Sequence, residues 1–592
     1  MELNPSAIVG IGVIGAVTFY LGFHSSRLAN TTPDFLVARR IVRSRRNAAA
    51  ISGEYLSAAS FLGIAGLILK DGVDSLWYAV GFTAGYLALL LFVAAPLRRS
   101  GAYTLPDFVA ARLGSVALRR LATVFVVVIS VLYLVPQLQG AGLTLSTVMP
   151  VPAWVGSAVV VLLVTVNAFG GGMRSITIVQ AFQYWVKLVA LALPTFVLIV
   201  VFVGGHPVAA SLSADSPPVF AHTTSVAIPA AVEVHEAAPV RVQAYGLVNG
   251  FQNNGPLLMN PGIPYKIGAH ATLVFPAGSP TPTPSDSPDT NAAWLRPQSG
   301  GVSALFSTYS LIVALFLGTM GLPHVLVRFY TNPNGRAARR TTLHVLLLLG
   351  LFYLFPTMLG ALSRLYTPEL LVTGQTDAAI LLLPGKLVGG MPGEILGAVI
   401  VAGAFAAFLS TSSGLLVSIA GVVSTEVFRG RVRDFRWATV IAALVPLTLA
   451  LLLPEADISL SVGLSFALAA STFCPVLVIG IWWRRLTWVG AAAGMVVGGG
   501  LVLTALVLNI ISEYTGAWAP WPVVQPALIT VPAAFATVFL VSLCTQDRLP
   551  PDVSRILLRL HAPDPLGFIK DRDVARFGPA APPSPVDGRH HR

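Results

Sequence analysis

A run of hydroxyl side chains, Ala406-Ala407-Phe408-Leu409-Ser410-Thr411-Ser412-Ser413-Gly414, interrupts one of the longest apolar segments of the chain. This segment covers residues 391–428 and has no charged residue between Glu394 and Glu426. Lipid offers no hydrogen bonds, so polar groups at membrane depth need partners within the protein. Adjacent Ser and Thr oxygens are hard ligands that suit a small hard cation. The run therefore predicts an ion site inside a membrane transporter, or hydroxyls that bond to their own helix or pack against neighbours.

The composition indicates a membrane protein. Of the 592 residues, 55% are hydrophobic and only 10% are charged, whereas soluble domains carry about 25% charged residues. The two cysteines, Cys474 and Cys544, form neither a disulfide framework nor a metal-binding spacing. Thirteen apolar segments are long enough to cross a bilayer, which takes about 20 residues: 6–24, 49–70, 75–97, 119–147, 152–169, 175–203, 304–327, 341–363, 391–428, 434–453, 458–483, 488–511 and 521–545.

Basic residues lie in alternate loops between these segments. The clusters fall at 27–46, 98–120, 174, 328–340, 429–436 and 484–485. Under the positive-inside rule, all of them lie in the cytoplasm if the N-terminus is outside and the C-terminus inside. The formal net charge of +12 therefore does not indicate a nucleic-acid partner. The first segment follows Glu2 and lacks a basic start, so we interpret it as a retained helix rather than a signal peptide.

Two regions are predicted to lie outside the membrane. Residues 204–303 form a long external loop or small accessory domain, and alternating stretches such as 240–245 predict a few strands within 219–275. The proline-rich run 278–288 is predicted to be a linker. The tail at 546–592 is predicted to be cytoplasmic and largely disordered, with a short helix at 553–560.

Two apolar segments contain helix-breaking residues. Residues 51–63 (ISGEYLSAASFLG) carry glycine, an acid and serines, and residues 318–324 (GTMGLPH) contain Pro323, which cannot continue a helix unbroken. The breaks open two successive five-segment groups, 49–203 and 304–483. Paired breaks of this kind are the best sequence indication of a transporter's binding site. Freed carbonyls can coordinate a cation, and the N-terminus of a half-helix favours an anion.

These motifs resemble the sodium/solute symporter family, and most closely its cation–acetate (monocarboxylate) permease branch. The resemblance covers the second to the thirteenth segment, apart from the external loop. The matching stretches are 53–63 (GEYLSAASFLG), 103–108 (YTLPDF) with Arg112, 171–173 (GGM), 321–329 (GLPHVLVRF) and 407–411 (AFLST). The SAASFLG stretch is what points to the acetate branch.

The resemblance implies an all-α membrane protein with a LeuT-type core of five-plus-five inverted helices. One extra helix and a basic loop (1–48) would precede the core, and two further helices (484–545) would follow it. The family's sodium site would correspond here to the carbonyls of Gly53, Leu56 and Ala407 and the side chains of Ser410 and Thr411. Five oxygens with little fixed charge make a weak, reversible site, as transport requires.

One position departs from the family pattern. Many members have Asp in the fifth core helix, on the proposed exit route of the ion, where this chain has Gln180. The helix therefore offers no carboxylate at that position, and the family's exit mechanism does not transfer directly.

By analogy with the fold, the substrate site lies beside the two breaks. Tyr55, Ser57, Ser60, Thr319 and His324 are the candidates, because hydroxyls and freed N–H groups could bind a small anion. As alternatives, the two serines are packing residues, Tyr55 packs its ring against a neighbouring helix, and His324 bonds to backbone loosened by Pro323 or carries a proton.

Two ionisable residues, Glu54 and Lys187, are predicted within the membrane, where such residues are costly and functional by default. They are expected to pair, or Glu54 takes up a proton during transport. In the other interpretation, Lys187 reaches the cytoplasmic face and Glu54 caps freed backbone groups.

The sequence thus predicts secondary active symport of a small monocarboxylate, acetate first, with sodium across a bacterial plasma (inner) membrane. Proton coupling through Glu54 is the main alternative, and a transport-related sensor is a weaker one. The chain has no motif of a membrane enzyme and no cluster of Cys and His that would bind a metal. We expect no organic cofactor, no nucleic-acid partner and no obligate protein partner; the partners are the substrate and the bilayer.

Overall fold

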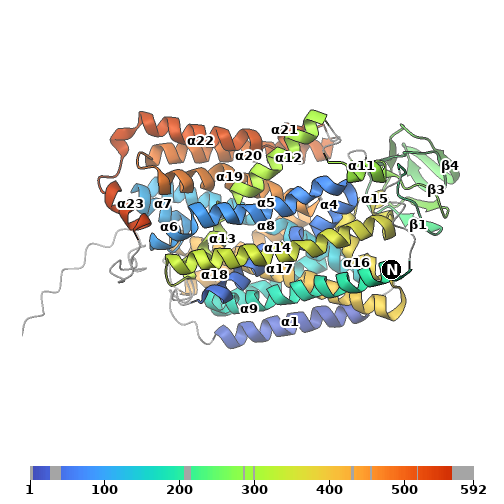
Figure 1. Cartoon of the computed structure of the whole chain (residues 1–592), viewed down its shortest axis with the longest axis horizontal. Coiled ribbons are helices and arrows are strands. Elements are labelled where there is room, and N and C mark those ends of the chain that lie inside the picture. Colours follow the sequence, from blue (N-terminus) through green and yellow to red (C-terminus); the bar gives the residue numbers. More distant parts are fainter. Residues whose placement is uncertain are drawn as a thin grey trace, which may run out of the picture.

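The computed structural model describes residues 5–26, 42–205, 215–284, 287–297, 301–428, 432–453, 457–515 and 518–562. These residues form a bundle of long helices that carries a small β-sheet at one end and the short helix α23 (Val553–His561) at the other (Figure 1). Of the expected cytoplasmic tail, residues 563–592 lie outside the described part of the chain.

Eleven helical stretches among the described residues are long and apolar enough to cross a membrane. The chain is therefore a helical, polytopic membrane protein with about eleven candidate spans. The expected thirteen are not reached, because segments 49–70 and 75–97 contribute one continuous stretch, Ala59–Phe92, and segment 152–169 yields only the shorter Ala153–Phe169. The orientation of the chain in the membrane stays a prediction.

The long helices of the bundle are α1 (Pro5–Ser26), α5 (Leu76–Phe92), α8 (Val116–Val148), α9 (Ala153–Gly205), α12 (Gly301–Gly318), α14 (Gly335–Tyr366), α17 (Gly390–Glu426), α18 (Val432–Leu452), α19 (Ile458–Trp482), α20 (Trp488–Thr515) and α22 (Ala527–Cys544). Shorter helices connect them: α6 (Ala94–Arg99), α7 (Leu105–Leu113), α11 (Asn291–Leu295), α15 (Glu369–Thr373), α16 (Ala379–Leu387) and α21 (Trp521–Val524). Helix α17, which carries the hydroxyl run, packs against α9, α8 and α1 and is almost entirely buried in its middle. It is therefore a central helix that is shielded from lipid.

Both predicted helix breaks are present. The first lies between α3 (Ser44–Tyr55) and a π-helical turn, Ala59–Gly63, which continues into α4 (Ile64–Asp71). The second lies between the end of α12 at Gly318 and the short helix α13 (Pro323–Val327). Pro323 stands in the first turn of α13, where its missing N–H costs nothing and its fixed φ suits a helix start. Each break therefore leaves backbone carbonyls and N–H groups free inside the bundle.

A seven-stranded antiparallel sheet follows α9 in the sequence. Its strands are β1 (Thr224–Ala227), β2 (Val232–His235), β3 (Val240–Val248), β4 (Phe251–Met259), β5 (Tyr265–Ile267), β6 (Thr272–Phe275) and β7 (Thr283–Pro284). The order is β1-β6-β3-β5-β2-β7, and β4 pairs with β3. The proline-rich run expected to be a linker instead supplies β7, whose place at the sheet edge tolerates a residue without an N–H.

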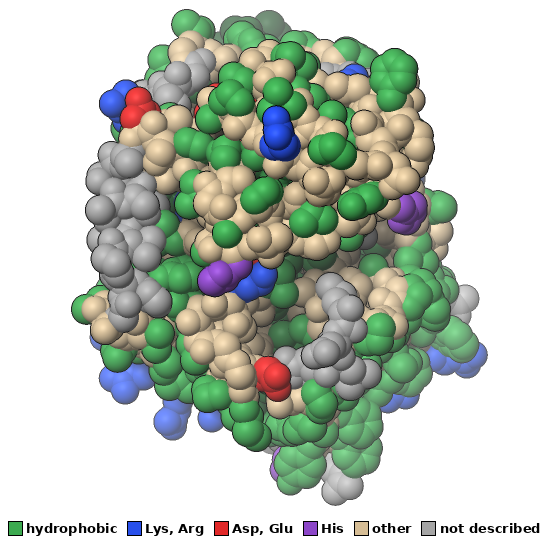
Figure 2. Space-filling model, turned by 90° about the vertical axis from the view of Figure 1, so that its right-hand side faces the viewer, with side chains coloured by type: hydrophobic (Ala, Val, Ile, Leu, Met, Phe, Trp, Pro, Cys, Tyr) green, Lys and Arg blue, Asp and Glu red, His purple; other side chains and the backbone are tan. Residues whose placement is uncertain are grey.

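The sheet is attached to the helical bundle. Val372 of α15 belongs to the apolar core beneath the strands, and the indole N–H of Trp294 in α11 donates to the carbonyl of Ile68 in α4 at 2.6 Å. Figure 2 views this end and shows a hollow between the sheet and the helices. A cavity of about 190 Å³ there is lined by Lys70, Glu233, Gly374 and Asp457, among others. The sheet is thus seated directly above the helix that carries the first break.

Candidate functional site

The hydroxyl run faces the first break. Ser410 Oγ donates to the carbonyl of Gly53 at 2.7 Å and lies 3.1 Å from the carbonyl of Ala407. Thr411 Oγ1 donates to the carbonyl of Glu54 at 2.6 Å. Both side chains are fully buried. The structure therefore places the α17 hydroxyls against the carbonyls that the break in α3 leaves free.

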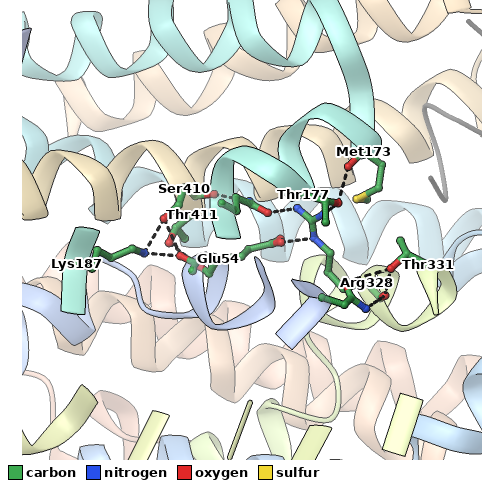
Figure 3. A network of polar contacts seen from close by, with 11 residues as sticks. Glu54, Met173, Thr177, Lys187, Arg328, Thr331, Ser410 and Thr411 are labelled. Carbon is green, nitrogen blue, oxygen red and sulfur yellow. Dashed lines mark hydrogen bonds and ion pairs between the residues drawn. The ribbon is translucent and has the colours of Figure 1, made fainter. Parts of the chain in front are cut away.

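Lys187 of α9 reaches into the same place. Its Nζ donates to the carbonyl of Gly53, to the carbonyl of Leu56 at 2.6 Å and to Ser410 Oγ at 2.6 Å. Figure 3 shows the side chain pointing from α9 toward Ser410 and Thr411. An ammonium has three donors and no acceptor, and all three have an oxygen partner here. The amino group of Lys187 thus occupies oxygens that were predicted to hold sodium.

Glu54 does not pair with Lys187 as expected. Its Oε2 accepts from Arg328 Nε at 2.5 Å, and both side chains are buried (Figure 3). The expected pair does not form because the ammonium is already held by the carbonyls of Gly53 and Leu56, while the Glu54 side chain lies toward the segment after α13. The other interpretation is also wrong, because Lys187 stays at the break and does not reach a surface.

Arg328 is a functional candidate that sequence reasoning missed. It lies in the single turn Arg328–Thr331 after α13 and is fully buried. Beyond Glu54, it donates to Thr177 Oγ1 at 2.8 Å and to Gln180 Oε1, both on α9. Hydropathy places Arg328 at the end of an apolar segment, where it is indistinguishable from the loop arginines that follow. Its place within the matching stretch 321–329, five residues after Pro323, is the sequence signal that could have marked it.

Gln180 links the two charged groups to the hydroxyl run. Its Nε2 donates to the carbonyl of Ser410 at 2.7 Å, while its Oε1 accepts from Arg328. The Gln180 amide can do both, whereas the ionised carboxylate of an Asp has no donor. Glutamine at position 180, where many family members have Asp, therefore fits the local geometry. The Arg328 guanidinium needs an acceptor here, and the Ser410 carbonyl needs a donor.

The residues predicted to bind substrate fall into two groups. The hydroxyl of Tyr55 lies 2.9 Å from Thr319 Oγ1, and so joins the two breaks. It also donates to the carbonyl of Phe82 at 3.2 Å. Ser60 instead bonds to the hydroxyl of Tyr353 at 2.9 Å, and Ser57 is buried near the break. The structure therefore brings Tyr55 and Thr319 together but gives Ser60 a different neighbour.

His324 occupies an apolar, aromatic environment beside the second break. It is fully buried, its ring centroid lies 5.1 Å from that of Tyr133, and neither ring nitrogen has a partner among the described residues. It thus does not bond to the backbone loosened by Pro323. Tyr133 packs on Phe466, which also packs on Tyr55. Buried polar atoms without partners are rare and costly, so these nitrogens are well placed to bind a ligand.

Gly53 lets the first break lie close against α9. A Cβ at Gly53 would lie 2.3 Å from the backbone oxygen of Gln180, a distance that real contacts do not reach. We expect Gly53→Ala to push α3 from α9, destabilise the protein by about 1–3 kcal/mol and impair transport. Thermal unfolding in detergent tests this. Gly350→Ala is the matched control, since no atom lies within 4 Å of its added carbon. Equal melting temperatures would contradict the prediction.

The described residues contain no group of three or more His, Cys, Asp and Glu that could hold a metal ion. The oxygens around Lys187 are the candidate cation site, and they come from one broken helix and one hydroxyl-bearing helix. Two interrupted helices, a buried ion-pair network and many apolar spans together define a membrane transporter rather than an enzyme.

The comparisons with known proteins identify the family. The model of the sodium:solute symporter family matches residues 35–236 and 258–498, so the chain belongs to this family. A symporter of Bacillus subtilis named YwcA, described as uncharacterized, is 27% identical over 568 residues, which cover 92% of this chain and 96% of the relative. A monocarboxylic acid transporter of Corynebacterium glutamicum is 28% identical over 561 residues, which cover 90% of each chain.

A solved structure shares the fold. It is the substrate-bound, outward-open state of a Na⁺-coupled sialic acid symporter, which superposes with a TM-score of 0.60 at 13% identity. The match covers 92% of this chain and 98% of the other. This likeness shows a common helical architecture and leaves the substrate to be argued from the site.

Proposed function

We propose that this protein is a secondary active symporter that carries a small monocarboxylate, with acetate as the expected substrate, across a bacterial plasma membrane. Support for the substrate class comes from the Corynebacterium relative and from the resemblance of the 53–63 motif. The observation that carries the proposal is His324, whose buried ring nitrogens lack partners beside the second break. A substrate carboxylate would accept a hydrogen bond there, while its short apolar part would lie against the rings of Tyr133 and Phe466.

The contacts between the two breaks also support an alternating-access mechanism, in which the site opens to one side of the membrane at a time. Tyr55 and Thr319 join the two breaks, and Ser410 and Thr411 tie the first break to α17. A ligand that binds beside the breaks would therefore alter contacts on both halves of the core. Coupling would follow if ion and substrate bind beside these joined breaks, because each would pre-organise the site for the other.

Two coupling ions are candidates. Sodium is the ion that the family resemblance predicts, at Gly53, Leu56, Ala407, Ser410 and Thr411. The placement of Lys187 among three of these residues favours the alternative, a proton, because the oxygens already have a cationic partner. Proton coupling is thus the mode we propose for this chain.

Uptake of labelled acetate into proteoliposomes tests the proposal. One sample has an inward sodium gradient at equal pH, and another has an inward proton gradient in sodium-free choline buffer. Protein-free liposomes are the control, because undissociated acetic acid crosses bilayers unaided. We expect protein-dependent accumulation with the proton gradient alone. Accumulation that needs sodium would reverse the choice of ion, and no uptake above the control would remove the substrate assignment.

A further inference from the structure

The Lys187 ammonium has the coordination that a bound cation would have. Its three oxygen partners come from both sides of the site, namely the carbonyls of Gly53 and Leu56 at the first break and the hydroxyl of Ser410 on α17. The Lys187 side chain is fully buried, so its amino group and these oxygens lie away from the solvent at the protein surface. Lys187, which belongs to α9, therefore connects the end of α3 to α17 through these hydrogen bonds.

Among the described residues, no acidic side chain near Lys187 forms an ion pair with it, because the nearby carboxylate pairs with Arg328. The acidic group near it is Glu54, which lies against the buried Arg328. Glu54 and Arg328 form an ion pair of their own at 2.5 Å. Because those two charges cancel, a protonated Lys187 gives the site one net positive charge, which is the charge that one bound sodium ion would bring.

A sodium ion and this ammonium would compete for the same oxygens. The ion would need the same carbonyls and the same hydroxyl, so the two cations would stand within a few ångströms of each other. Two unit charges 4 Å apart repel by about 4 kcal/mol even at an effective dielectric constant of 20. The oxygens fit a single cation, and Lys187 supplies it.

We infer that Lys187 is a built-in substitute for the coupling sodium ion, so that the wild-type chain binds no sodium between α3 and α17. This inference rests on the proposed function for its meaning in transport, but the binding property stands on the geometry alone. It has a further consequence: removal of the side chain should vacate a cage of carbonyl and hydroxyl oxygens that accepts sodium.

The test compares sodium binding by the purified full-length protein and its variants in detergent. Wild type should show no ²²Na⁺ binding and the same melting temperature in sodium and choline chloride. Lys187→Ala should gain saturable ²²Na⁺ binding and a sodium-specific rise in melting temperature of about 2–4 °C. In proteoliposomes, the variant's acetate uptake should become dependent on sodium.

The matched control is Gln183→Ala, which removes a buried side chain one turn earlier on α9 that bonds to Thr18 instead. It should gain no sodium binding, and the double variant Lys187→Ala/Ser410→Ala should lose most of the gain. Lys187→Ser is a second variant in case Lys187→Ala does not fold. If neither variant folds, the wild-type protein provides the test. Saturable ²²Na⁺ binding by wild type would overturn the inference, and the absence of binding would support it.

The outcomes separate this inference from the proposed function. Sodium binding by wild type would overturn the role of Lys187 and leave monocarboxylate transport untouched. A folded Lys187→Ala protein that binds no sodium would also overturn it. Failure to move acetate under any gradient would remove the substrate and leave the binding result unaffected.

Discussion

Replacing Arg328 with Met should abolish transport and destabilise the folded protein by about 3–5 kcal/mol, because it leaves the Glu54 carboxylate buried without its partner. Arg328 is fully buried, and its guanidinium holds Glu54, Thr177 and Gln180 at once. Loss of the Arg328 side chain therefore leaves the Glu54 carboxylate and the polar groups of Thr177 and Gln180 buried without this partner. Thermal unfolding and acetate uptake, measured on the same preparations, give the two readouts.

Arg336→Met is the matched control, because Arg336 is an exposed residue of the following helix. It should change neither stability nor uptake. The double variant Glu54→Gln/Arg328→Met removes the stranded charge and should recover most of the lost stability without recovering transport. An Arg328→Met protein that melts with the Arg336→Met control would show that the ion pair contributes little to folding.

The importance of Arg328 follows from what it connects. Glu54 belongs to the first break, and Arg328 follows the second. Gln180 continues the chain of contacts to the backbone of Ser410, whose hydroxyl meets Lys187. A movement at either break would therefore have to rearrange buried polar contacts, which favours discrete states over gradual ones.

The backbone features of this site could be predicted from the sequence because they depend on local chemistry. Pro323 indicates a helix start, because proline fits the first turn of a helix better than its interior. The hydroxyls of Ser410 and Thr411 need partners in any apolar segment. The first signal marks the second break, and the second marks the contact between α17 and the first break. The alternating stretch at 240–245 likewise lies in a strand, β3.

The side-chain pairing could not be predicted, because it depends on how helices distant in sequence are rotated against each other. Lys187 and Glu54 are opposite charges in apolar segments, so pairing was the simplest expectation. Packing instead turns Lys187 onto backbone carbonyls and brings Arg328, from a segment 274 residues away, to Glu54. Carbonyl acceptors have no sequence signature, since every residue has one.

Replacing His324 with Leu should weaken acetate transport about 10- to 100-fold while leaving the protein as stable as wild type or more so. The expected loss follows from one hydrogen bond to a charged acceptor, which is worth about 1.5–3 kcal/mol, at about 1.4 kcal/mol per tenfold change. The stability should not fall, because the ring nitrogens form no hydrogen bond with the described residues, and so the substitution removes none. Concentration-dependent uptake and thermal unfolding measure the two effects.

A residue that only supports the fold would behave in the opposite way. If His324 served the backbone loosened by Pro323, His324→Leu would lower the melting temperature and reduce uptake only through loss of folded protein. His324→Gln keeps an N–H donor and should retain part of the transport, with a raised KM rather than a lowered amount of folded protein. His344→Leu is the control, since His344 lies on the exposed side of α14 and bonds to its own helix. Wild-type KM in His324→Leu would remove His324 from the substrate site, and with it the observation on which the proposed substrate rests.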